Sequence, residues 1–300
     1  MSRKNVLILS LLFMAILFRA SFSVGQEKLK IFISVDMEGI AGIVHPDQTS
    51  SSGKDYNIAR RWMTQEVNAA ILGALEAGAT EIVVNDSHGS MRNVIPSELN
   101  SKAYLVTGSP KPMSMMQGID ETFDAVIFIG YHAHAGTEDG VLDYTYSGSS
   151  IYSIKINDLE MGEGEINAAI AGWYKVPVVL ITGDRVVCKQ VKRILGDELE
   201  VAVVKEGTGR YAAKSLSPKK AQELIKTKTK IALEKRKKIK PFILKPPFHF
   251  EVNFLRSYQA EQAELIPQVK RKGARSVSFT ADDFIVGFKL LRALIYLTRT

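Results

Sequence analysis

The sequence predicts an α/β protein with three layers (α/β/α), built on a mainly parallel sheet and followed by a C-terminal α+β extension. Short apolar runs rich in β-branched residues alternate with longer segments of helical periodicity. These runs are continuous rather than alternating, which is typical of parallel strands covered on both faces. The chain has 300 residues, 46% of them hydrophobic and 24% charged, which is enough for a sizeable core and excludes a disordered or collagen-like protein.

The first half of the chain begins with a strand and a helix. Leu29–Val35 is predicted to be a buried strand because it is apolar and rich in β-formers. Apolar residues at helical spacing predict a helix over Tyr56–Ala77, with Gly78 as its C-terminal stop. Further strands are expected at Glu81–Asn85, Ala125–Gly130 and, with half-exposed alternation, Ile151–Ile156.

The second half continues the alternation and then changes character. A helix is predicted at Gly162–Trp173 and a buried strand at Pro177–Ile181. Ser217 and Pro218 are a typical helix start and open a lysine-rich helix to about Lys240. Strand candidates follow at Phe248–Phe254 and Ser276–Phe279, and a terminal helix begins near Asp282.

Residues 1–25 are predicted to be a signal peptide. Arg3 and Lys4 precede an apolar run, and small residues follow, with cleavage expected after Ser23 or Gly25. The run is shorter than the roughly 20 residues that span a bilayer, although an uncleaved anchor is the alternative. We therefore expect an exported protein, periplasmic or extracellular, without stable membrane association after cleavage. The expected division is a metal-binding α/β domain at 26–215 and an extension at 216–300 that packs on it and is a candidate oligomerisation surface.

Charge and cysteine content narrow the classes of partner. The chain carries 39 basic and 32 acidic residues, but three of the basic residues lie in 1–25, which leaves a net charge of +4. The lysine-rich stretch 226–240 has an apolar face at helical spacing and no interleaved aromatic residues, so it is predicted to be a solvated helix face. We expect no nucleic-acid partner. Cys188 is the single cysteine, so no intramolecular disulfide can form.

Polar side chains follow three of the predicted strands. Asp36 and Glu38 come directly after the first strand, two residues apart, so both point the same way in an extended backbone. His88 follows the second strand and His132 the third. Ligands of open parallel sheets bind beyond the carboxyl ends of the strands, so these four side chains are expected at one rim. Glu163 opens the next helix, from which it can reach the same rim.

Together these five side chains predict a metal site, although each alone has a plainer reading as a turn former or a hydrogen-bonding group. Carboxylates gathered at a partly buried rim repel one another unless cations hold them. Mixed imidazole and carboxylate ligands suit Zn²⁺, with Mn²⁺ or Co²⁺ as alternatives. Five ligands, three of them anionic, exceed the usual set for one zinc. They fit two ions that share a carboxylate.

Five segments around these residues occur together, in this order, in a known family. They are SVDMEG (34–39), VNDSH (84–88), GYHA (130–133), MGEGEINA (161–168) and VPVVLITGD (176–184). Through them the chain resembles the zinc-dependent D-aminopeptidases of the DppA type, peptidase family M55. Matched position by position, Asp36, Glu38, His88, His132 and Glu163 coincide with the family's two-zinc ligands, with Glu165 as the fallback for Glu163. The resemblance implies release of N-terminal D-amino acids from short peptides such as D-Ala-D-Ala. It also implies a ring-stacked homodecamer with its sites facing an internal channel.

One position departs from the family pattern. The family places a catalytic histidine in the loop after GYHA, and the matching residue here is Tyr144, in GVLDYTYS. A tyrosine with an ordinary pKa near 10 cannot accept a proton at neutral pH as imidazole does. It can donate a hydrogen bond to an oxyanion, or ionise beside zinc. His134 is the substitute that the neighbouring sequence offers.

Three functions remain open at this point. The leading hypothesis is a two-zinc aminopeptidase that acts on D-amino-acid peptides. The second is a catalytically impaired protein that binds metal and peptide, with Tyr144 as the reason. The third is a two-metal phosphoesterase, because similar ligand sets serve both chemistries. The absence of a phosphate-cradling glycine loop or arginine cluster beside the motifs argues against the third.

Overall fold

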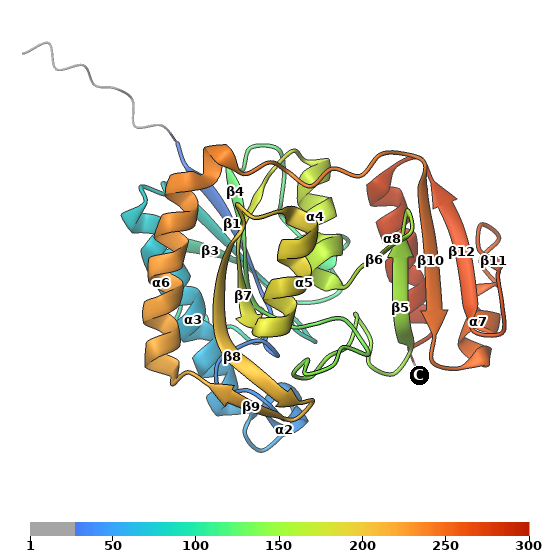
Figure 1. Cartoon of the computed structure of the whole chain (residues 1–300), viewed down its shortest axis with the longest axis horizontal. Coiled ribbons are helices and arrows are strands. Elements are labelled where there is room, and N and C mark those ends of the chain that lie inside the picture. Colours follow the sequence, from blue (N-terminus) through green and yellow to red (C-terminus); the bar gives the residue numbers. More distant parts are fainter. Residues whose placement is uncertain (1–27, 300) are drawn as a thin grey trace, which may run out of the picture.

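The computed structural model describes residues 28–299 and contains two sheets (Figure 1). In the main sheet every neighbouring pair of strands is parallel except the last, β8 and β9. The mainly parallel sheet expected from the sequence is therefore confirmed. Its strands, in spatial order, are β3 (Ala103–Val106), β2 (Glu81–Asp86), β1 (Lys30–Val35), β4 (Ala125–Tyr131), β7 (Val178–Asp184), β8 (Glu200–Gly209) and β9 (Ala212–Ser215).

Helices cover both faces of the main sheet, which confirms the three-layer arrangement (Figure 1). Helices α3 (Tyr56–Glu76) and α6 (Pro218–Lys235) lie together on one face. Helices α4 (Glu163–Trp173) and α5 (Arg185–Leu195) lie on the other. In β1, Ile31 and Ile33 belong to the core beneath α3, whereas Phe32 belongs to the core that contains α4. Both faces of the strand are buried, which explains why its sequence is continuously apolar.

The second sheet is antiparallel and joins the C-terminal part of the chain to β5. Its order is β11 (Lys270–Arg271), β12 (Ser276–Ala281), β10 (Phe248–Phe254), β5 (Ile151–Ile156) and β6 (Leu159–Glu160). Helices α7 (Ser257–Ala263) and α8 (Phe284–Leu297) pack on it. Strand β5 pairs with β10, so it lies outside the main sheet. Its half-exposed alternation suits an antiparallel sheet with one face towards solvent. The division at residue 215 stays a prediction.

Several element boundaries differ from the expected ones. Helix α6 begins at Pro218 as predicted but ends at Lys235, where a short 3-10 turn, η2 (Arg236–Lys238), replaces it. Strand β7 continues to Asp184, and the short strand β3 was not predicted. Two short elements, α2 (Pro46–Thr49) and η1 (Ser114–Met116), lie in the loops near the site. The predicted signal peptide falls outside the described residues, and among 28–299 no helix is long and apolar enough to cross a membrane.

Candidate metal centre

The predicted ligands meet at the carboxyl ends of three adjacent strands. Strand β1 lies between β2 and β4, and these three strands lead into Asp36, His88 and His132 respectively. Glu38 follows in the turn after β1, and Glu163 is the first residue of α4. All five side chains are buried. A helix N-terminus favours negative charge, so the position of Glu163 suits a carboxylate.

Two glycines allow the turn after β1 to lie directly against the end of β4. The amide of Gly39 donates to the carbonyl of Gly130, at 2.8 Å. A Cβ atom at Gly39 would lie 2.0 Å from the carbonyl oxygen of Tyr131, and one at Gly130 would lie 2.3 Å from that of Asp36. Gly130 also has a φ of +68°, which other residues adopt at a cost. This close approach brings the carboxylates of the turn beside His132.

The five ligands form two donor groups that share Asp36. The first group is Asp36, Glu38 and His88, and the second is Asp36, His132 and Glu163. Within each group the donor atoms all lie within 4.8 Å of one another. In the first, His88 Nδ1 is 3.3 Å from Asp36 Oδ1 and 2.9 Å from Glu38 Oε2. In the second, His132 Nε2 is 3.4 Å from Asp36 Oδ2 and 3.7 Å from Glu163 Oε1. Each carboxylate oxygen of Asp36 therefore faces a different group.

Backbone carbonyls orient both imidazoles. His88 Nε2 lies 2.8 Å from the carbonyl oxygen of Thr49, and His132 Nδ1 lies 3.0 Å from that of Ala133. A carbonyl only accepts, so each of these nitrogens carries the hydrogen. In the neutral ring, the opposite nitrogen then presents its lone pair to the carboxylates. This is the usual way in which a second contact fixes the tautomer of a metal-binding histidine.

Two buried polar atoms of the second group lack hydrogen bonds. Among the described residues, Asp36 Oδ2 and His132 Nε2 have no hydrogen-bond partner, although they are only 3.4 Å apart. Leaving such buried atoms without partners costs free energy, so two of them that converge on one point are suited to bind a cation. Carboxylate oxygens and imidazole nitrogens are zinc donors, and these residues therefore fit a zinc ion.

Electrostatics in the cluster also favour bound positive charge. Burial raises the pKa of Glu163 to about 7. Burial alone would lower the pKa of His132, but the charges of Glu163 and Asp36 raise it to about 10. The pKa of His88 is raised in the same way by Glu38 and Asp36, against the effect of burial. Burial alone would raise the pKa of Asp36, but the adjacent imidazoles of His132 and His88 hold it well below its usual range. The field that retains protons on these imidazoles would also attract a divalent cation.

The other predicted site residues lie in different surroundings. Tyr144 borders both groups, since its hydroxyl donates to Glu38 Oε1 at 3.1 Å and its ring stacks on His132. His134 instead contacts Thr137, with Nδ1 3.2 Å from its hydroxyl, and belongs to neither donor group. Glu165 accepts a hydrogen bond from the amide of Gly162 at 3.0 Å, as part of the α4 N-terminal cap. Glu163, rather than the fallback Glu165, therefore stands with the other donors.

A buried lysine that the sequence analysis did not select supports the turn after β1. Lys205 of β8 is 1% exposed, and its Nζ donates to the carbonyls of Glu38, Ile40 and Ile43, the last two at 3.0 and 2.5 Å. Burial lowers its pKa to about 8. Its one sequence signal is a lysine directly after the apolar run Val201–Val204. The contact fixes the backbone that carries Glu38.

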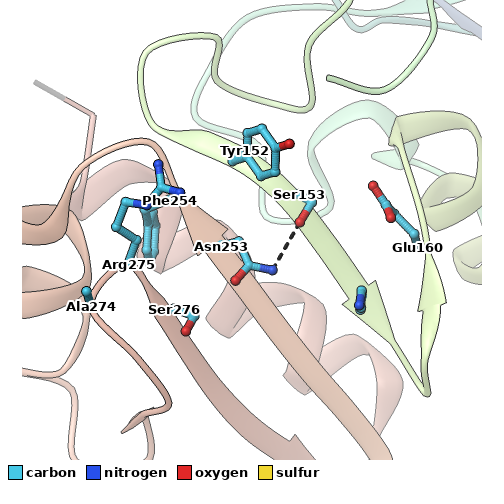
Figure 2. Close-up of a pocket in the computed structure, with 9 residues that line it drawn as sticks. Tyr152, Ser153, Glu160, Asn253, Phe254, Ala274, Arg275 and Ser276 are labelled. Carbon is cyan, nitrogen blue, oxygen red and sulfur yellow. Dashed lines mark hydrogen bonds between the residues drawn. The ribbon is translucent and has the colours of Figure 1, made fainter. Parts of the chain in front are cut away.

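A separate hollow lies on the second sheet, and none of the five metal donors lines it (Figure 2). Its floor includes Ser153 of β5 and Asn253 of β10, joined by a hydrogen bond of 3.0 Å. The lining residues include one carboxylate, Glu160, and no histidine or cysteine. It therefore lacks the donors that a zinc site requires.

Comparisons with known proteins agree with this geometry. The family model for peptidase M55, described as D-aminopeptidase, matches residues 29–293. A D-aminopeptidase of Bacillus subtilis (strain 168) is 39% identical over 271 residues, which cover 88% of this chain and 95% of that protein. Among solved structures, the Zn-dependent D-aminopeptidase DppA from Bacillus subtilis, described as a self-compartmentalizing protease, superposes with a TM-score of 0.88. It is 35% identical, and the match covers 90% of this chain and 98% of that one. The chain thus belongs to peptidase family M55, the D-aminopeptidases.

Proposed function

We propose that this protein is a metallo-aminopeptidase that binds two zinc ions per chain and releases N-terminal D-amino acids, such as D-Ala, from short peptides. The observation that carries the proposal is the position of Asp36, which contributes one carboxylate oxygen to each of two buried donor groups. A shared carboxylate between two such groups is the arrangement expected of a two-metal hydrolytic site. The two relatives support the same function, since both are named D-aminopeptidases.

In this proposal the chain's own residues have distinct tasks. Glu38 and His88 complete one group with Asp36, and His132 and Glu163 complete the other. Zinc held there would polarise the scissile carbonyl and lower the pKa of a water molecule. The hydroxyl of Tyr144 donates to Glu38 Oε1 here, and with Glu38 engaged by a metal ion it would instead be available to donate to the oxygen that becomes negatively charged. Burial of the groups keeps bulk water away from them, which strengthens these electrostatic interactions.

The second candidate is a metal- and peptide-binding protein without turnover. Its support is Tyr144, which by the resemblance matches the position of the family's catalytic histidine. Burial, together with the charges of Glu38 and Asp36, raises the pKa of this tyrosine above its ordinary value. Such a raised pKa disfavours the ionised form that a general base requires at neutral pH.

The deciding experiment measures D-alanine release from D-Ala-D-Ala by the purified protein, stripped of metal and then reloaded with zinc. L-Ala-L-Ala serves as the control substrate. Zinc-dependent release that is selective for the D-peptide supports the aminopeptidase. A folded, zinc-loaded protein that releases nothing supports the binding protein, and hydrolysis of an aryl phosphate would favour a phosphoesterase. Mn²⁺ and Co²⁺ are tested in parallel.

Two further parts of the proposal concern assembly and location. The solved relative is described as self-compartmentalizing, which supports a homo-oligomer here, and we propose a decamer. Sedimentation velocity would test it. Export to the periplasm or the extracellular space rests on residues 1–25 alone, and N-terminal sequencing of the secreted protein would test the cleavage site.

A further inference from the structure

A buried arginine on the terminal helix lies next to the metal centre without a charged partner. Arg292 of α8 is 8% exposed. Its Nη2 donates to the hydroxyl of Tyr296 at 3.2 Å, whereas its Nε has no hydrogen-bond partner in the described part of the chain. No ion pair joins it to a carboxylate within residues 28–299. An unpaired guanidinium in such a place indicates an anion that is bound there in the working protein.

The arginine and the metal centre line the same small polar cavity. Its walls include Tyr144 and Glu163 from the centre, Tyr146 and Ser114 beside them, and Arg292 and Arg299 from the C-terminal end. Tyr146 connects the two sides. Its backbone amide donates to Glu163 Oε1 at 2.6 Å, and its ring lies 5.0 Å from the Cζ atom of Arg292. Tyr146 therefore contacts both the guanidinium of Arg292 and the metal donor Glu163.

The surroundings of Arg292 suit a carboxylate ligand. The rings of Tyr146 and Tyr296 lie 5.0 and 4.9 Å from its Cζ atom and restrict the guanidinium by cation–π contact. A guanidinium held in this way presents fixed N–H donors, which match the two oxygens of a carboxylate. Arg299 adds a second positive charge at the same cavity. The cavity thus has a metal-donor end and a cationic end.

We propose that Arg292 binds the free C-terminal carboxylate of a peptide whose amino end lies at the metal centre. This inference rests on the proposed aminopeptidase function and assigns its substrate class. Two residues of extended chain span at most about 7 Å, so such an anchor beside the centre selects dipeptides over longer peptides. The C-terminal segment then supplies a specificity residue in addition to its packing role.

The rival explanation is that Arg292 only balances the negative charge of Glu163 and its neighbours. Substrates that differ only in the C-terminal group distinguish the two explanations, because only the proposed anchor depends on a free carboxylate. We would compare D-Ala-D-Ala with D-Ala-D-alaninamide, which lacks the carboxylate, using the zinc-loaded wild type, Arg292→Gln and Arg292→Lys. Arg275→Gln, at an exposed arginine in the turn between β11 and β12, is the matched control. Zinc content and melting temperature are measured for every variant.

The wild type is expected to prefer the free dipeptide over the amide. Arg292→Gln should lower kcat/KM for D-Ala-D-Ala roughly 10- to 100-fold, mainly through KM, and leave the amide within about 2-fold. Arg292→Lys should show a smaller loss than Arg292→Gln, because lysine keeps the positive charge but lacks the paired N–H donors of the guanidinium. Equal losses on both substrates, or no loss on either, would overturn the proposal.

Calorimetric titration with the two peptides measures binding, and so tests the anchor even if the protein does not cleave them. If the wild type cleaves neither substrate, the proposed aminopeptidase activity fails, but binding of the two peptides can still be compared. A dipeptide that binds 10- to 100-fold more tightly than its amide to the wild type, and equally to Arg292→Gln, supports the anchor. A wild type that binds both equally, or neither, rejects it.

Discussion

The ring of Tyr144 stacks on the imidazole of His132, with centroids 4.3 Å apart and an interplanar angle of 27°. Its hydroxyl reaches the other donor group, where it donates to Glu38 Oε1 at 3.1 Å. One side chain thus contacts both halves of the centre. Because its pKa is raised, first by burial and then by the charge of Glu38, the hydroxyl keeps its proton at neutral pH. With no cation beside it, Tyr144 is therefore a hydrogen-bond donor rather than a base.

Substitution of Tyr144 tests this role. Tyr144→Phe keeps the stacked ring and removes the donor, so kcat for D-Ala-D-Ala should fall about 100-fold with KM little changed. Tyr144→His should raise activity if the family's histidine has simply been lost. Steady-state kinetics on zinc-loaded variants measure both effects. Unchanged or lower activity of Tyr144→His would reject the idea of a lost histidine, and unchanged kcat in Tyr144→Phe would reject the donor role.

The number of zinc ions bound per chain should show whether Asp36 is shared by the two donor groups. Asp36→Ala removes a donor from both groups and is expected to bind no zinc, whereas Glu163→Gln affects one group and should retain about one ion per chain. Inductively coupled plasma mass spectrometry of the dialysed protein measures the zinc content per chain. Glu165→Gln is the matched control with both ions kept, since Glu165 caps α4 instead. Loss of zinc from Glu165→Gln would show that the assignment of Glu163 is wrong.

Lys205 is expected to matter for both stability and zinc affinity. Lys205→Met leaves the buried carbonyls of Glu38, Ile40 and Ile43 without their donor. Loss of these contacts should lower the free energy of unfolding by about 3 kcal/mol and weaken zinc binding, because the turn that carries Glu38 is released. Urea denaturation and zinc titration measure the two effects. Lys214→Met, an exposed lysine of β9, should change neither.

The pH dependence of stability should reveal Glu66, a buried carboxyl of α3. Its Oε1 accepts a hydrogen bond from the amide of Ala41 at 2.9 Å, and burial raises its pKa from 4.5 to about 7. The unfolded chain loses this proton near pH 4.5 and the folded chain near pH 7, so the contribution of Glu66 is lost as pH rises between these values.

Glu66→Gln removes this ionisation while it keeps the acceptor for Ala41. Its stability relative to the wild type should therefore increase from pH 4.5 to pH 8, by up to roughly 3 kcal/mol. Urea denaturation at a series of pH values measures the difference. Glu234→Gln, an exposed residue of α6, is the control. A difference between Glu66→Gln and the wild type that stays constant with pH would contradict the prediction.

The sequence was most informative where strands end. Buried parallel strands read as apolar runs, so Asp36, His88 and His132 stood out as the polar residues that follow them. The contacts that orient the imidazoles could not be predicted, because the carbonyls of Thr49 and Ala133 belong to the main chain and carry no residue-type signal. Strand β3 was missed because it has four residues and is only partly buried.

The partner strand of β5 also could not be predicted from the sequence pattern. Periodicity shows that a segment is extended, but β5 pairs antiparallel with β10, whose residues lie almost a hundred positions later. Arg292 illustrates the same difficulty at the site. It lies in an amphipathic helix, where an arginine is ordinarily read as solvent-exposed, and its burial beside Tyr146 depends on how α8 packs against the main part of the chain.

The central place of β1 in the main sheet constrains the order in which the protein can form. Ile31 pairs on one side with Ile82 and on the other with Ala125, so the first strand gains its second neighbour only after β4 has been made. Such long-range parallel pairing folds slowly compared with local structure. Asp36 follows this strand, and its two donor groups draw on residues up to Glu163. A nascent chain therefore lacks the complete two-group centre until more than half of it has emerged and paired, and loading of the second group with metal should mark the end of folding rather than its beginning.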